Sequence, residues 1–180
     1  MTVDGYASLL LRLTLGVIMA AHGYNHLWGP GGVEGTARWF AGIGLRPARA
    51  HAVVSGVLEL AAGLGLLVGF VTPLCVAAVV GVSTVAGVTV HRKHGFFVFK
   101  DGYEYVLTLA LAAVALALLG SGTLSVDHVL RLRFTAWWGG GAALLGVLGA
   151  GALLAAGWRP SAPEEPAAGN VGATAVQEGE

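Results

Sequence analysis

Charged residues are scarce in this chain. Lys, Arg, Asp and Glu make up 11% of the 180 residues, whereas hydrophobic residues make up 56%. A soluble domain usually carries about a quarter charged residues, so the composition excludes an ordinary soluble protein and indicates an integral membrane protein. The formal net charge is zero, which gives no reason to expect nucleic acid or an acidic substrate as partner.

Cysteine is nearly absent as well. The single Cys75 excludes an internal disulfide and a CxxC redox pair, and the chain contains neither a CxxCH nor a GxGxxG motif. The sequence therefore does not describe a complete oxidoreductase, and whether the chain is an enzyme stays open. The residues around Cys75 are apolar, which favours an unreactive thiol. The sequence does not decide the role of Cys75.

No Lys or Arg precedes the first apolar run, and Arg12 lies inside it. A secretory signal peptide would begin with positive charge, so we expect a retained membrane span. Spanning the hydrocarbon core takes about 20 mostly apolar residues, and five segments qualify: residues 5–27, 50–70, 73–90, 102–119 and 136–158. No alternating pattern of strands is present, so we predict an all-α bundle.

The segments between and after these spans differ in character. GVEGTARWFAGIGL, residues 32–45, is consistent equally with a short interfacial or re-entrant helix and with an ordered surface loop. The Pro-, Ala- and Glu-rich tail, residues 159–180, is predicted to be disordered. Small residues in the spans, such as Gly65 and Gly69 or Ala142, Gly146 and Ala150, favour internal helix packing over dimerisation.

Polar residues concentrate at the membrane face where the odd-numbered spans end. His22, Asn25 and His26 share one helical face because they are three and four residues apart. We expect a polar pocket there, near His51, although histidines at this depth also bond simply to headgroups, water or loop carbonyls. The other candidates for ligand binding or proton relay are Glu34, Arg38, Glu59, His91, His94, Tyr103 and Glu104.

Two ionisable residues lie deeper, since Arg12 and Glu59 both fall near the middle of their spans. A charge at that depth costs roughly 2.5–3.5 kcal/mol, so we expect an intramembrane Arg12–Glu59 pair. Such a pair either takes part in the function of the protein or is a structural ion pair that fixes the register of the two helices. For cofactors, His22 and His26 supply only two of the three or four ligands that a metal needs, so no metal site is assigned; quinone is favoured over haem.

Four ordered stretches resemble the signatures of the DoxX family of small bacterial membrane proteins. They are HGYNHLWGPGGVEGTARWFAGIGL, ELAAGLGLLVGFVT, HRKHGFFVFKDGYEY and GSGTLSVD, between Arg12 and Asp127. The positions carried over are His22, Gly23, Glu34, Gly35, Glu59, Gly95, Phe96, Phe97, Tyr103, Glu104, Tyr105 and Asp127. The family commonly has Lys where this chain has His26, which makes any positive charge at that position depend on pH.

The resemblance implies a DoxX-like four-helix transmembrane bundle, here over residues 1–135, with an additional transmembrane helix over 136–158 and the tail over 159–180. It also implies a membrane subunit of a redox or oxidative-stress complex, with a pocket for quinone or another lipid-like ligand and with protein partners. The alternative is a non-enzymatic module for assembly, lipid handling or cargo binding. A small-solute transporter is a weaker reading because no inverted repeat is evident.

Orientation follows from Lys and Arg. Seven of these residues lie in the first and third connections or after the last span, against Arg131 and Arg133 on the other side. The resemblance implies a bacterial cytoplasmic membrane, and the positive-inside rule then predicts an N-terminus outside and a C-terminus in the cytoplasm.

Overall fold

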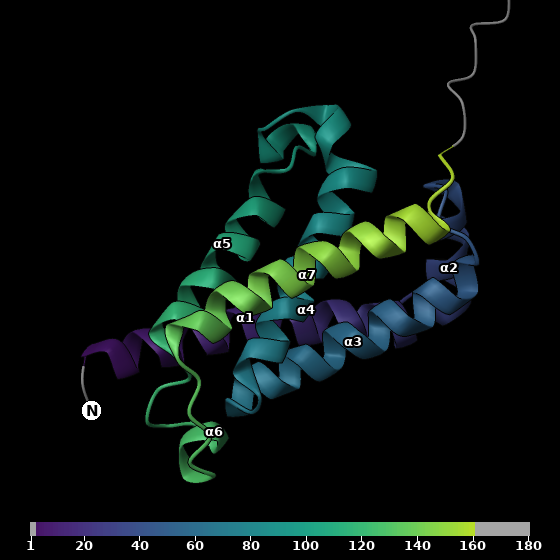
Figure 1. Ribbon diagram of the computed structural model, residues 1–180. Coiled ribbons are helices and arrows are strands. Elements are labelled where there is room, and N and C mark those ends of the chain that lie inside the picture. Colours follow the sequence, from purple (N-terminus) through teal and green to yellow (C-terminus); the bar gives the residue numbers. More distant parts are fainter. Residues whose placement is uncertain (1–2, 161–180) are drawn as a thin grey trace, which may run out of the picture.

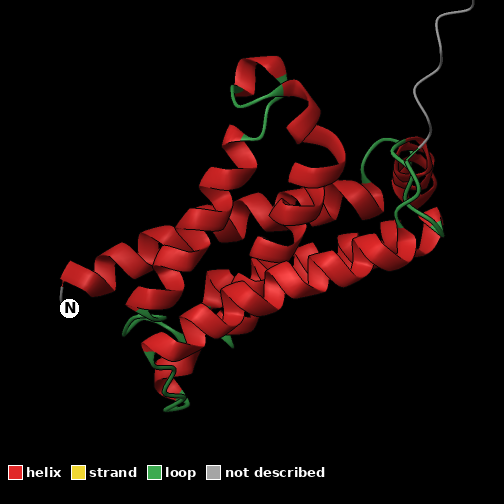
Figure 2. Cartoon of the chain, turned by 45° about the horizontal axis from the view of Figure 1, so that its top comes forward, coloured by secondary structure: helices red, strands yellow, loops and turns green. Residues whose placement is uncertain are grey.

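The computed structural model describes residues 3–160, and the regular elements in that range are helices. They are α1 (Val3–Trp28), α2 (Gly32–Gly42), α3 (Ala48–Val68), α4 (Thr72–Ala86), α5 (Glu104–Leu119), α6 (Val126–Val129) and α7 (Ala136–Gly157). A π-helical segment (Gly87–His91) and a 3-10 turn (Arg92–His94) continue α4, and a second 3-10 turn spans Val98–Lys100. Figure 2 shows these helices joined by loops, and the predicted all-α class is confirmed.

Four helices of the described chain are long and apolar enough to cross a membrane. They are α1, α3, the α4 segment extended to His94, and Trp137–Gly157 of α7. Helix α5 has 16 residues, about 24 Å of helix, against a hydrocarbon core of about 30 Å. The predicted span at 102–119 is therefore an apolar helix that is shorter than the other four.

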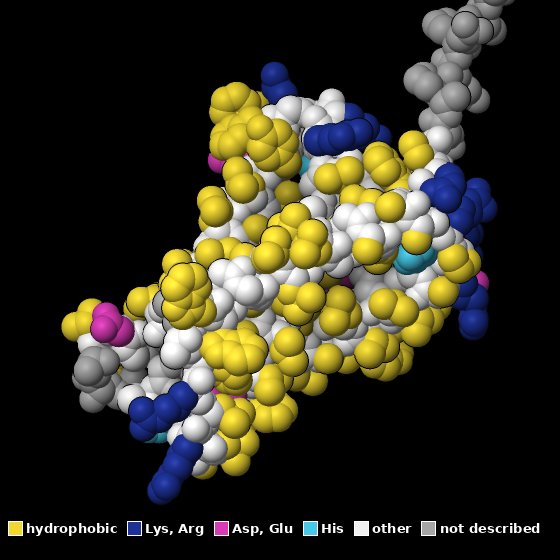
Figure 3. All heavy atoms as spheres, in the orientation of Figure 1, with side chains coloured by type: hydrophobic (Ala, Val, Ile, Leu, Met, Phe, Trp, Pro, Cys, Tyr) yellow, Lys and Arg dark blue, Asp and Glu magenta, His cyan; other side chains and the backbone are white. Residues whose placement is uncertain are grey.

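The helices form an elongated bundle. Helix α1 packs against α3, and α7 packs across α4 and α5; the α4–α5 connection leans away from the other helices (Figure 1). Figure 3 shows apolar side chains along the flank of the bundle and Lys and Arg side chains near its ends. An apolar flank with charged ends is the surface that a lipid bilayer requires.

Glycines set the contact between α1 and α3. A Cβ on Gly23 would lie 2.7 Å from the carbonyl oxygen of Gly56, and a Cβ on Gly63 would lie 2.8 Å from that of Gly16. Contacts this short involve backbone atoms, which cannot swing aside. The two glycines of each helix are seven residues apart, so each pair lies on one helix face and fixes the register of the two helices.

The apolar core lies between α1, α3, α4, α5 and α7. Its most buried side chains are Leu15, Leu66, Val76, Val79, Ala113 and Leu116. Helix α7 contributes Ala142, and a Cβ on its Gly146 would meet the Ala77 carbonyl oxygen of α4 at 2.5 Å. The predicted stripe of Ala142, Gly146 and Ala150 thus packs inside the chain, as the sequence predicts.

Backbone hydrogen bonds attach the end of α7 to the connection between α2 and α3. The Arg46 amide donates to the Gly157 carbonyl, and the Arg159 amide donates to the Gly44 carbonyl, each at 2.7 Å. We call this two-bond contact the α7 bridge. The predicted fifth helix is therefore attached to the rest of the bundle at its C-terminal end; beyond Pro160, the predicted disordered tail lies outside the described residues.

Trp158 reinforces the α7 bridge. Its Nε1 donates to the Ile43 carbonyl at 2.9 Å, and the guanidinium carbon of Arg92 lies 5.7 Å from the centre of its ring. A cation over an indole ring contributes roughly 0.5–1 kcal/mol at an exposed site. Trp158 thus joins α7 to the α2–α3 connection and to the end of the extended α4.

At the opposite end, Asp127 of α6 caps helix α4. Its Oδ1 accepts from the Val71 amide at 2.7 Å, and its Oδ2 accepts from the Thr72 amide at 3.1 Å and the Thr72 hydroxyl at 2.7 Å. The side chain is fully buried. A carboxylate at a helix N-terminus satisfies amides that have no partner within the helix and is favoured by the helix dipole.

Candidate functional site at the α1–α2 elbow

The stretch WGPGG between α1 and α2 makes a sharp reversal of the chain. Gly31 and Gly32 have φ angles of 84° and 52°, in the left-handed region that side chains other than glycine rarely adopt. The Thr36 hydroxyl then donates to the His26 carbonyl at 3.0 Å and holds α2 against the end of α1. The reversal places the amphipathic α2 beside the polar end of α1, and the helical interpretation of residues 32–45 is confirmed for 32–42.

His26 reaches from this elbow to Glu59 of α3. Its Nδ1 lies 3.5 Å from Glu59 Oε1, and the two side chains are 15% and 2% exposed. The approach depends on Gly56, where a Cβ would lie 3.2 Å from the His26 Cβ. Ser55, one turn before Glu59, donates a hydrogen bond to the same carboxylate oxygen. Ser55, Glu59 and His26 therefore lie in one row, with a hydrogen bond between the first two and a 3.5 Å approach between the last two, and we call this row the Ser55–Glu59–His26 relay.

An aromatic contact orients the imidazole. The Phe40 ring of α2 meets the His26 ring edge to face, with centroids 5.7 Å apart and planes at 86°. Phe40 is buried, so it also keeps α2 seated on the bundle. His26 Nδ1 is buried and makes no hydrogen bond within the described chain, which leaves the Glu59 carboxylate as its charged neighbour.

A pocket of about 330 Å³ opens beside this imidazole, and we call it the elbow pocket. It is lined by Asn25 and His26 of α1 and by Gly35, Thr36 and Trp39 of α2. Its volume lies at the small end of the range for ligand sites. Donors and acceptors from Asn25, His26 and Thr36 surround a space beside the Trp39 indole, an arrangement that suits a flat ligand with a few polar atoms.

Charged residues lie outside this pocket. Arg49 Nε donates to Glu34 Oε1 at 2.7 Å, but the two side chains are 74% and 63% exposed. An exposed pair of this kind contributes about 0–1 kcal/mol. His22 is exposed on α1, and the Arg38 guanidinium lies near Gly31 and Gly35. Glu34, Arg38 and His22 thus surround the elbow without taking part in the relay.

The predicted pairing of Arg12 with Glu59 is corrected by the structure. Arg12 lies against Gly69 at the end of α3 and donates to the Leu124 carbonyl. Glu59 lies ten residues before Gly69, about 15 Å along the helix axis. The two were expected at similar depth, but the antiparallel register of α1 and α3 brings His26, and not Arg12, to Glu59.

The remaining candidates belong to the connection between α4 and α5. His91 Nδ1 lies 2.7 Å from the Asp101 carbonyl oxygen, Glu104 Oε2 accepts from the Val98 amide at 2.9 Å, and Tyr103 meets Phe96 edge to face. His94 is exposed. These contacts stabilise the connection itself, and among residues 3–160 no hydrogen bond or ion pair joins these side chains to the elbow pocket.

His51 and Cys75 also have local partners. A His51 ring nitrogen lies 3.1 Å from the Arg46 carbonyl oxygen, next to the α7 bridge. The buried Cys75 thiol donates weakly to the Phe70 carbonyl at 3.4 Å, and its sulfur would meet a Cβ at Gly65. Cys75 is thus packed at the α3–α4 turn, away from the elbow.

Two members of the elbow site were missed in the sequence. Ser55 precedes Glu59 by four residues, so the two share a helix face, a signal that was available. Thr36 belongs to a helix that could not be distinguished from a loop. Among the described residues, no group of three or more His, Cys, Asp or Glu side chains could hold a metal ion.

The long apolar helices and the apolar flank define an integral membrane protein with a helical bundle. Residues 7–92 match the model of the DoxX family, which supports the resemblance that the motifs of the chain show. The matched range contains α1 from residue 7 onward together with α2, α3 and α4, and so the whole relay. DoxX proteins are generally associated with membrane redox and stress functions. No curated protein and no solved structure gave a significant match.

Proposed function

We propose that this protein is the membrane subunit of a redox or oxidative-stress complex and that its elbow pocket binds a quinone or another lipid-like molecule with a polar ring. The observation that carries the proposal is the Ser55–Glu59–His26 relay, which ends at this pocket. An ionisable group buried within a membrane is costly and marks a functional site by default.

In this proposal the chain binds the ligand and handles protons. Reduction of a quinone to a quinol takes up two electrons and two protons. The His26 imidazole donates a hydrogen bond to a quinone carbonyl oxygen through Nε2, the ring nitrogen that does not face Glu59, and gives that oxygen one proton, which the protonated Glu59 carboxyl group replaces at Nδ1. Water at the membrane face supplies the second proton to the other quinone oxygen. A partner protein supplies the electrons, because the sequence has no cysteine pair or haem-attachment motif.

A titration with a water-soluble menaquinone analogue tests this assignment. Full-length protein in lipid nanodiscs should bind the analogue at one saturable site, and His26→Gln should weaken binding about tenfold, the effect of a lost charge-assisted hydrogen bond. His22→Gln is the matched control, since His22 lies one turn away on α1 and is exposed. Absence of a saturable site, or equal affinity of wild type and His26→Gln, rules the proposal out.

The alternative function, a non-enzymatic assembly or cargo-binding module, draws support from the α4–α5 connection. Phe96, Phe97 and Phe99 are 45%, 52% and 76% exposed there, and their rings contact one another in sequence. Exposed aromatic clusters mark binding surfaces or membrane interfaces. A pull-down in mild detergent whose partners are lost on deletion of residues 161–180, without loss of bound quinone analogue, would favour this second function.

A further inference from the structure

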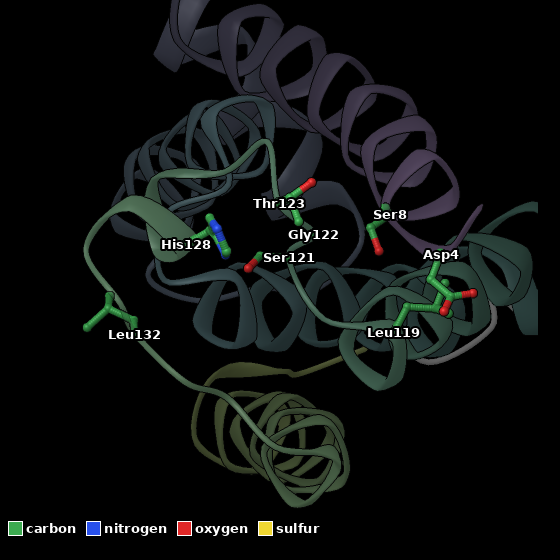
Figure 4. Close-up of a pocket in the computed structure, with 9 residues that line it drawn as sticks. Asp4, Ser8, Leu119, Ser121, Gly122, Thr123, His128 and Leu132 are labelled. Carbon is green, nitrogen blue, oxygen red and sulfur yellow. The ribbon is translucent and has the colours of Figure 1, made fainter. Parts of the chain in front are cut away.

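A second pocket lies at the opposite end of α1 from the elbow, and we call it the α6 pocket. It has a volume of about 250 Å³ and is lined from three sides: by the start of α1, by the end of α5 and by the segment that carries α6. The residues that line it include Asp4, Ser8, Leu119, Ser121, His128 and Leu132. Figure 4 shows Ser8, Ser121 and His128 around the space between these segments.

The floor of the α6 pocket carries a buried hydroxyl without a partner. Ser8 is 1% exposed, and its Oγ makes no hydrogen bond within residues 3–160. Burying a hydroxyl without a hydrogen bond is unfavourable in proteins, so such a group favours a partner that enters the pocket. Ser8 is buried because the segment before α6 packs closely against it. Gly122 of that segment has a φ angle of 75°, and a Cβ at this position would lie 3.2 Å from the Ser8 Cβ.

Further polar groups surround this hydroxyl. The Ser121 Oγ lies 3.2 Å from the Ser125 Oγ, and the single hydrogen of Ser125 is donated to the Gly122 carbonyl at 2.6 Å, so the Ser121 oxygen keeps its lone pairs free to accept toward the pocket. Deeper on the same face of α1, one turn beyond Ser8, Arg12 Nε and Nη1 are buried and make no hydrogen bond in the described chain. Arg12 does not line the α6 pocket, so the polar groups that a ligand there meets include the hydroxyls of Ser8 and Ser121 and the carboxylate of Asp4.

Charge does not favour an ion in this pocket. The carboxylate of Asp4 stands at its rim, and the positive charge of Arg12 below it interacts with the negative charge of the buried Asp127. An anion would be repelled by Asp4, whereas a cation would approach Arg12. A neutral ligand with several hydroxyl groups avoids both costs, because each hydroxyl both donates and accepts hydrogen bonds.

The surroundings of the pocket fit a lipid. Leu119 and Leu132, which form its apolar sides, are 44% and 39% exposed. The pocket lies where the membrane-spanning α1 begins, at the depth of lipid headgroups. We propose that the α6 pocket binds a neutral, hydroxyl-rich headgroup of a membrane lipid, with Ser8 as its deepest hydrogen-bonding group and Asp4 accepting from a hydroxyl at the rim.

Native mass spectrometry of the full-length protein tests this proposal. The protein is purified in mild detergent and offered equal amounts of monogalactosyl diacylglycerol and phosphatidylcholine. One galactolipid should be retained per chain in preference to phosphatidylcholine, and Ser8→Ala should reduce that preference about three- to tenfold, the effect of one hydrogen bond. Ser83→Ala, which removes a buried hydroxyl of α4 that does not line the pocket, should leave it unchanged.

Two further measurements complete the test. One distinguishes a lipid headgroup from a free polyol, and the other shows whether Ser8 contributes to stability. Methyl galactoside that displaces the galactolipid, or that binds when the lipid does not, would assign the same site to a free polyol. Without either ligand, Ser8→Ala should unfold at the same temperature as wild type or above it, because the hydroxyl has no partner to lose. Equal retention of both lipids together with no binding of methyl galactoside, or a Ser8→Ala variant with unchanged preference, would overturn the proposal.

Discussion

The carboxylate of Asp127 and the first residue of α4, Thr72, are joined by two hydrogen bonds to a single oxygen, one from the amide and one from the hydroxyl. The contact links residues 55 positions apart in the chain. It attaches the short α6 to the start of a membrane-spanning helix and buries the carboxylate completely. The last of the DoxX-like motifs, GSGTLSVD, thus has a structural role as the cap of α4.

Asp127→Asn should destabilise the protein. The side-chain NH2 group of Asn would face the backbone amide of Val71 or Thr72, which is itself a donor. The substitution also removes a charged acceptor, and a hydrogen bond to such an acceptor contributes about 1.5–3 kcal/mol. We expect a loss of about 2 kcal/mol in the free energy of unfolding, measured by chemical denaturation in detergent micelles. Asp101→Asn is the control, since Asp101 is exposed with φ 61°, which Asn adopts readily; a similar loss in both variants would contradict this role.

Gly23→Ala should separate α1 from α3. The added methyl would meet the backbone of Gly56 and Leu60, and overpacking of a tight contact costs about 1–3 kcal/mol. The melting temperature in detergent should fall. In Gly149→Ala of α7 the methyl enters open space, so that variant should be neutral or slightly more stable. A neutral Gly23→Ala would show that the two helices can move apart without cost.

Trp158→Phe should weaken the α7 bridge. The substitution keeps an aromatic ring but removes the hydrogen bond from Nε1 to Ile43, which contributes about 0.5–1.5 kcal/mol. Hydrogen exchange of the Arg46 and Arg159 amides, the two donors of the α7 bridge, should then be faster than in wild type. Trp137→Phe, at a position that is 90% exposed, controls for loss of an indole; equal exchange rates in all three proteins would refute the expected weakening.

Glu59→Gln tests the relay apart from the ligand. Gln keeps the size of the side chain and can still accept from the Ser55 hydroxyl, but it removes the negative charge beside His26. We expect the His26 ring signals in NMR spectra recorded at one fixed pH to shift in Glu59→Gln relative to wild type, because the carboxylate oxygen 3.5 Å from Nδ1 is replaced by an uncharged amide. Glu34→Gln, at the exposed pair with Arg49, should leave those signals in place; unchanged signals in both variants would contradict the contact.

Cysteine labelling tests the proposed orientation. Phe99 of the α4–α5 connection and Val129 of α6 are both 76% exposed and lie at opposite ends of the bundle, whereas the native Cys75 is buried. In intact spheroplasts, a membrane-impermeant maleimide should modify Val129→Cys and leave Phe99→Cys unmodified until the membrane is opened. The reverse pattern would place the N-terminus in the cytoplasm.

Much of the helix pattern could be predicted from composition, because only long apolar helices satisfy their backbone in lipid. The predicted spans at 5–27, 50–70 and 136–158 correspond to α1, α3 and α7 within a few residues. The start of the span predicted at 102–119 could not be located in this way, because hydropathy does not show where the first hydrogen-bonded turn of a helix forms. Asp101, with its left-handed φ angle, and Gly102 belong to the preceding connection, and α5 begins at Glu104.

The pairing of ionisable residues could not be predicted in the same way. The Arg12–Glu59 pair was predicted from the similar depth of the two residues in the membrane. The partner of a buried charge, however, depends on how two helices are shifted along each other. Here that shift is set by Gly16 and Gly23 against Gly56 and Gly63. Their seven-residue spacing was visible in the sequence, whereas the pairing of one glycine pair with the other required the structure.

The α7 bridge also bears on how the protein is made. Trp158 and Ile43 are 115 positions apart, and α1, α2 and α3 emerge from the ribosome well before α7. Chains fold from the N-terminus during synthesis at about 5–20 residues per second, so the α2–α3 connection waits several seconds for its backbone partner. Over that interval the Gly44 carbonyl and the Arg46 amide lack the two partners that they have in the finished bundle, and arrival of the final helix supplies both.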